Sequence, residues 1–78
     1  MASKLTARQF LALGYLDAHG PVTAGDLPMA RDTARAVLAG LARKGFAAEG
    51  AHGSYAITDA GRPALAAARE EARREAGT

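Results

Sequence analysis

The sequence predicts a mostly α-helical fold with a small β-hairpin, in the order helix, short helix, helix, hairpin, helix. Apolar residues recur at helical spacing in residues 6–19 and 30–46. After residue 45 the spacing changes to alternation, which is typical of paired strands. Pro63 then opens a last stretch of alanine and charged residues, a composition that favours a helix. We therefore expect a three-helix core, a two-stranded hairpin and a C-terminal helix.

The length of 78 residues predicts one domain, because a second hydrophobic core would need roughly 50 more residues. We expect residues 5–62 to form the core and the hairpin, and residues 63–78 to form the last helix, charged and frayed at its end. The hydrophobic fraction is 49%, but the chain has only two Phe, two Tyr and no Trp, so the core must be small.

Composition also indicates the cellular compartment in which we expect the protein. The chain has no cysteine, which excludes disulfides and thiolate metal sites and fits a reducing compartment. No apolar run approaches the roughly 18 residues of a membrane span, and the first residues lack the apolar centre of a signal peptide. We expect a soluble, cytoplasmic protein without a membrane partner.

The sequence offers no constellation of catalytic residues. It has no nucleophile beside a base, no paired carboxylates in an apolar setting and no phosphate-binding loop, so we expect no enzyme activity and no cofactor. Asp17 and His19 lie two residues apart and do not share a helix face, so we expect no metal site either.

Local signals define the first two helices. Thr6 and Gln9 form a capping box, and a Gly-Pro pair ends the helix that they start, predicted over residues 6–19. Thr23 and Asp26 suggest a second, poorer capping box for a helix of about one turn, which a following proline ends. The core face of the first helix is predicted to hold Phe10, Leu13 and Leu16, with Ala12 or Tyr15 at its margin.

The third helix is predicted over residues 32–44, with Asp32 as its cap and Gly45 as its stop. Its buried stripe has i, i+3, i+4, i+7 spacing and consists of Ala34, Val37, Leu38 and Leu41. The residues expected to point outward are small or basic: Thr33, Arg35, Ala36, Ala39 and Arg43.

Positive charge is concentrated on this third helix. Residues 30–46 contain one anion and four cations, namely Arg31, Arg35, Arg43 and Lys44. The net charge of this stretch is therefore +3, whereas the whole chain carries +2. A basic amphipathic helix with small outer residues is what a nucleic-acid recognition helix requires.

The hairpin is predicted from strands at residues 46–49 and 54–58, joined by a turn at residues 50–53. Phe46 and Tyr55 have two possible roles, stacking on bases or packing in the hairpin core. The alternating pattern favours the core.

The last helix, over residues 63–76, has Leu65 as its only large apolar residue. Its second half interleaves arginine and glutamate, which supports a helix by close ion pairs rather than by packing. Because a dimer would have only a small seam on this helix, we expect a monomer or a weak homodimer.

The chain resembles the winged helix-turn-helix over nearly its whole length. LTARQFLALGYLDAHGPVTAGDL is similar to the first two helices of bacterial MarR-type and PadR-like transcriptional regulators. LARKGF, residues 41–46, is similar to the block that closes their recognition helix. YAITDAGRPAL, residues 55–65, is similar to the block that leaves their wing.

The resemblance implies a small transcription regulator of bacterial or phage type that binds double-stranded DNA. The helix of residues 32–44 would enter the major groove and read bases from its first turn. The start of the second helix would offer backbone donors to a phosphate, and the wing tip would approach the minor groove. The residues implied are Thr33, Arg35 and Ala36 for base edges, Arg31, Arg43 and Thr23 for phosphates, His52 for the wing, and Lys44 beside Arg43.

A second hypothesis is a winged-helix module that binds a protein partner and no DNA. The wing contains no Lys or Arg between Glu49 and Ser54, and the net charge of the chain is low. The partner would contact the alanine-rich faces of the third and last helices. Winged helices serve both purposes, so the fold alone does not decide between these functions.

Overall fold

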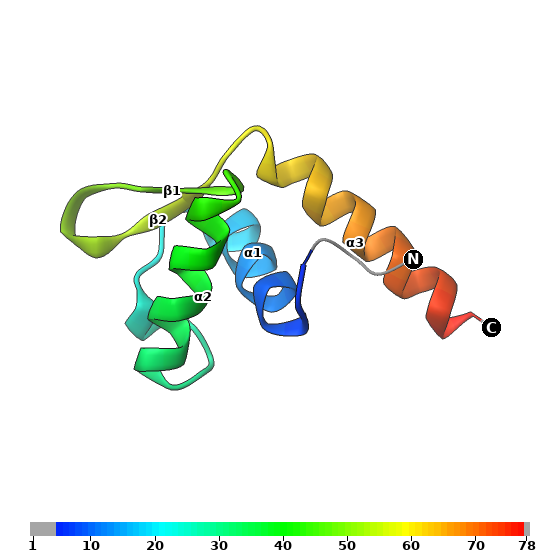
Figure 1. The fold of residues 1–78 in the computed structure, drawn as a ribbon, viewed down its shortest axis with the longest axis horizontal. Coiled ribbons are helices and arrows are strands. Elements are labelled where there is room, and N and C mark those ends of the chain that lie inside the picture. The colour runs from blue at the N-terminus through cyan, green and yellow to red at the C-terminus, as the bar shows by residue number, and fades with distance from the viewer. Residues whose placement is uncertain (1–4, 78) are drawn as a thin grey trace.

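In the computed structural model, which describes residues 5–77, three α-helices and two 3-10 turns accompany one two-stranded antiparallel sheet (Figure 1). The predicted mostly helical class with a hairpin is confirmed for these residues; residues 1–4 and 78 of the predicted domain lie outside them. The elements are α1 (Ala7–His19), η1 (Ala24–Asp26), α2 (Arg31–Arg43), β1 (Ala47–Glu49), η2 (Ala51–Gly53), β2 (Tyr55–Ile57) and α3 (Gly61–Ala76).

Both ends of α1 lie where the sequence predicts them. The Gln9 N–H donates to Thr6 Oγ1 and the Thr6 N–H donates to Gln9 Oε1, both at 3.1 Å, which completes the capping box. Gly20 has a φ of 77°, and its N–H donates to the Leu16 carbonyl oxygen at 3.0 Å. The chain therefore leaves the helix at the predicted glycine.

α2 runs from Arg31 to Arg43, one residue earlier at each end than predicted, and Asp32 is not its cap. The N-cap is Ala30, which makes no side-chain hydrogen bond, and its carbonyl oxygen accepts the Ala34 N–H at 2.8 Å. The prediction was wrong because aspartate is a preferred cap and alanine a poor one, so residue preference pointed two positions too far. Asp32 instead lies in the first turn, where its negative charge interacts favourably with the helix dipole.

Gly45 turns the chain from α2 into the hairpin, as predicted. Its φ is 82°, its N–H donates to the Ala42 carbonyl oxygen at 3.0 Å, and the Phe46 N–H donates to the Leu41 carbonyl oxygen at 2.9 Å. These two bonds form a Schellman motif, which requires the left-handed conformation that glycine adopts without steric cost.

The hairpin is joined to the link between α1 and η1. β1 and β2 pair in antiparallel register, with Glu49 opposite Tyr55. Val22 forms a single bridge to Tyr55, in which each N–H donates to the other residue's carbonyl oxygen at 3.0 and 2.8 Å. This bridge was not predicted, because a single residue leaves no alternating pattern in the sequence. Its consequence is that the start of η1 is held beside the hairpin.

The core lies where α1, α2, the hairpin and the first half of α3 meet. The α2 stripe is buried as predicted, whereas on α1 Ala12 is fully buried and Phe10 only half-buried, so the buried face of α1 is rotated from the prediction. Phe46 and Tyr55 are half-buried against the core. The largest fully buried side chains are Leu13, Leu16, Leu38, Leu41 and Leu65.

α3 packs against α1, which lies between α3 and α2 (Figure 1). It begins at Gly61, two residues before the predicted Pro63. Beyond Ala68 no residue of α3 is buried, and its second half extends away from the body, which gives the molecule a longest dimension of 42 Å. Within residues 5–77 no helix has both the length and the apolar character needed to cross a membrane.

Candidate nucleic-acid interface

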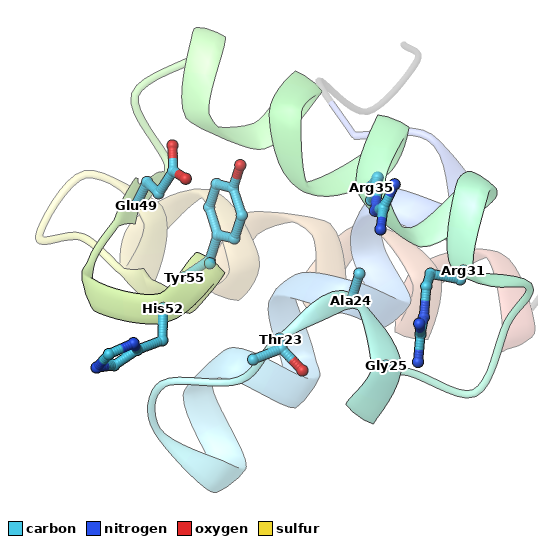
Figure 2. Close-up of a pocket in the computed structure, with 9 residues that line it drawn as sticks. Thr23, Ala24, Gly25, Arg31, Arg35, Glu49, His52 and Tyr55 are labelled. Atoms are coloured by element: carbon cyan, nitrogen blue, oxygen red, sulfur yellow. The ribbon is translucent and has the colours of Figure 1, made fainter.

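A groove of about 450 Å³ lies between the first half of α2, the start of η1 and the hairpin. The Val22–Tyr55 bridge holds η1 beside the hairpin, and η1 in turn packs against α2. Figure 2 shows the two α2 arginines on one side of the groove, hairpin side chains on the other, and the backbone of η1 between them. The groove brings together four of the predicted site residues: Thr23, Arg31, Arg35 and His52.

Arg31 and Arg35 lie one helical turn apart on the same flank of α2, and both are exposed. Arg31 lies against η1, since a Cβ added to Gly25 would be 3.3 Å from Arg31 Nη2. Among the described residues, neither arginine forms an ion pair. Glu49 lines the opposite side of the groove, so the groove contains charges of both signs.

Thr23 does not offer its backbone donor to the groove. Its N–H donates to Asp26 Oδ2 at 2.9 Å and its hydroxyl donates to the same oxygen at 3.2 Å. The predicted phosphate contact through the Thr23 N–H is therefore unavailable while the Asp26 carboxylate occupies that position. The hydrogen bond that caps η1 therefore uses the same N–H group that was predicted to bind a phosphate.

His52 lies at the tip of the hairpin, in the left-handed conformation with a φ of 59°. It is exposed, and its ring points away from Arg31 and Arg35 (Figure 2). His52 thus lies in the turn between the two strands, as the sequence predicts, and the two arginines are the cations that face the groove.

A second hollow, of about 830 Å³, lies on the other flank of α2, between that helix and the start of α1. It contains two predicted site residues, the half-buried Thr33 and the exposed Ala36. It also contains Arg8 and Asp32, which were not among the predicted site residues. Arg8 lies outside the basic stretch in sequence and is brought to α2 only by the packing of α1 against α2, so no local signal marks it.

Arg43 and Lys44 lie at the far end of α2, about 18 Å along the helix axis from Arg31. Arg43 is exposed and forms no ion pair with the residues that the structure describes. Lys44 Nζ donates to Gln9 Oε1 at 2.8 Å, so its ammonium is held over the start of α1. Of these two predicted residues, only Arg43 projects freely from the helix end.

The arginines of α3 differ from those of α2 because three of them contact carboxylates. The ion-pair distances are 3.0 Å for Arg62–Asp59, 3.7 Å for Arg69–Asp17 and 3.6 Å for Arg73–Glu70. The positive charge of α3 is thus balanced within the molecule, whereas that of α2 is directed to the surroundings.

Comparison with known proteins returned no match to a family model, a curated protein or a solved structure.

Proposed function

We propose that the protein is a winged helix-turn-helix transcription regulator that binds double-stranded DNA by placing α2 in the major groove. In this proposal α1, η1 and α2 are the helix-turn-helix unit, the β1–β2 hairpin is the wing, and α2 is the recognition helix. One observation carries the proposal. Arg31, Arg35 and Arg43 are exposed on α2 without ion pairs in the described chain, whereas three arginines of α3 are paired.

Cations that have no ion pair and lie on one helix favour the binding of a polyanion such as DNA. Each arginine that neutralises a phosphate releases condensed counterions, a gain that an arginine already paired with a carboxylate does not supply to the same extent. α3 lies on the far side of α1 and leaves the outer surface of α2 open. A helix fits the major groove, which is about 12 Å wide.

In this proposal the two DNA backbones lie along the two flanks of α2, at the hollow on each side. Arg31 and Arg35 border one hollow and Arg8 borders the other. We assign these three side chains to phosphates of the two strands that flank the major groove. This assignment moves Arg35 from the base edges to the backbone, because it shares a flank with Arg31 and faces η1 and the hairpin.

The proposal is tested by titrating labelled duplex DNA of mixed sequence with the full chain at several salt concentrations and measuring fluorescence anisotropy. Arg31→Ala, Arg35→Ala and Arg43→Ala should each weaken binding by roughly 1 kcal/mol and reduce the slope of log K against log salt by about 0.9. The matched controls are Arg62→Ala and Arg73→Ala, which remove the same charge from α3. They should leave both quantities nearly unchanged.

Absence of duplex binding by the wild-type chain at low salt would contradict the proposal, as would an equal loss in the α3 controls. Recovery of a stoichiometric protein partner that survives nuclease treatment would then favour the alternative, an interaction module without DNA binding.

A further inference from the structure

We infer that Asp32 is a base-reading residue of α2 and that it selects cytosine in the major groove. The inference rests on the proposed function and names the base that the recognition helix prefers. The Asp32 carboxylate accepts no hydrogen bond from the residues that the structure describes.

Asp32 has no partner in the described chain. Ala30 is the N-cap of α2, the Asp32 side chain is exposed, and it forms no hydrogen bond or ion pair with residues 5–77. Its interaction with the helix dipole needs no particular direction of the carboxylate. Asp26, which lies in the first turn of η1, differs because it accepts two hydrogen bonds from Thr23.

The first two turns of α2 place cations and the anion on different flanks. Arg31 and Arg35 border the groove beside η1 and the hairpin. Asp32 and Ala36 border the hollow beside α1, four residues apart and so one above the other on the helix. In the proposed complex Arg31 and Arg35 contact the phosphates of one strand, and Arg8, on the α1 side of the second hollow, contacts those of the other strand. Asp32 and Ala36, on the α2 side of that hollow, then lie between the two backbones and face the base edges.

The chemistry of the base edges then selects one base. An ionised carboxylate only accepts hydrogen bonds, so it is repelled by the acceptors of guanine and thymine. Adenine offers a donor, N6, but places the acceptor N7 beside it. Cytosine offers the N4 amino group, and a carboxylate accepting from N4 is the favoured pairing for Asp and Glu. A hydrogen bond from cytosine N4 therefore offsets the repulsion between the Asp32 carboxylate and the DNA phosphates better than a contact with any other base.

The test is a selection from random duplexes with the full chain, comparing wild type, Asp32→Asn and Asp32→Ala. The wild type should enrich a C·G pair at one position, with a preference for cytosine of roughly 5- to 150-fold. In Asp32→Asn the same position should change to adenine, because an amide binds N6 and N7 together. Asp32→Ala should lose the preference at that position, which supports the inference without depending on the amide.

Glu71→Gln is the matched control, because it also removes one carboxylate but lies on α3, outside both hollows beside α2. It should leave the base preference unchanged. Thermal unfolding monitored by circular dichroism shows whether each variant is folded.

If the Asp32 variants bind DNA with the wild-type base preference, the inference is wrong and the proposed function stands. If the wild-type chain binds no duplex at all, both are wrong. Whether the wild-type chain binds duplex DNA therefore distinguishes a failure of the inference from a failure of the proposed function.

Discussion

Gly61 is buried where the start of α3 passes the hairpin. Its N–H donates to Thr58 Oγ1 at 3.0 Å, which holds the first turn of α3 against the strand exit. A Cβ at this position would overlap the Phe46 carbonyl oxygen and would lie 2.8 Å from Ile57 Cγ1. The close approach of two backbone segments therefore requires glycine here for space rather than for a special backbone conformation.

We expect Gly61→Ala to lower the free energy of unfolding by about 1 to 3 kcal/mol, because the new methyl group overpacks the contact with Phe46. Gly14→Ala is the control, since its Cβ would meet only Arg69 Nη2, at 3.9 Å. In the middle of α1 it should stabilise by up to about 1 kcal/mol through helix propensity. Urea unfolding followed by circular dichroism measures both. Wild-type stability in Gly61→Ala would show that the two segments are not this close.

The residues that the sequence predicts correctly are those whose role is local. Gly45 was predicted because the left-handed stop of a helix depends on its immediate neighbours. The requirement for Gly61 was not predicted, because it arises from Phe46, fifteen residues earlier in the chain. The assignment of Asp32 as a cap failed for a related reason: capping preference is local, but the position at which α2 begins also depends on the packing of the chain before it.

At the scale of elements, α3 depends on very few side chains. Leu65 is 2% exposed and is the only large apolar residue of this helix; Ala68 is its other buried apolar side chain. The Arg69–Asp17 ion pair between α3 and α1 spans 3.7 Å with both side chains partly exposed, so it contributes little. The attachment of α3 to the body therefore rests mainly on one leucine.

We expect Leu65→Ala to destabilise the protein by about 2 to 5 kcal/mol, because it removes a fully buried side chain and leaves a cavity. Leu11→Ala removes the same atoms from α1 at a position that is 47% exposed, and it should cost much less. Thermal unfolding of the two variants measures the difference. Equal losses would mean that α3 is not anchored through Leu65.

Element order and most element ends could be predicted from the sequence. The capping box of α1, the glycine after α2 and the change of apolar spacing are all short-range signals, and they placed the helix ends within two residues. The Val22–Tyr55 bridge and the packing of α3 on α1 could not be predicted, because each joins segments that are distant in sequence. The bridge matters for the proposed function, since it holds η1 beside the hairpin at the groove that Arg31 and Arg35 border.

At the scale of the whole molecule, the charges are divided between two sides of α1. On the α3 side, three arginines contact carboxylates; on the α2 side, Arg31, Arg35 and Arg43 have no ion pair in the described chain. The net charge of +2 hides this division, so the proposed function rests on the local distribution of charge and not on the total.

The candidate site was predictable in part, because the positive charge on α2 is concentrated in one stretch of the sequence. The basic stretch identified the α2 arginines, but the sequence could not show which flank of the helix each one borders. It also could not show that Asp26 occupies the Thr23 donor, that Lys44 contacts Gln9, or that Arg8 joins the site from α1. All of these depend on the packing of separate elements.

The central claim is that the outer surface of α2, with the hollow on each flank, is the DNA-binding surface. It is tested most directly by titrating the ¹⁵N-labelled chain with a short duplex at low salt and following the backbone amide resonances. We expect the largest shifts at Arg31, Asp32 and Arg35, smaller shifts at Arg8 and in the hairpin, and little change in the second half of α3. Shifts confined to α3 and to the surface around Leu11, or no shifts at all, would contradict the account.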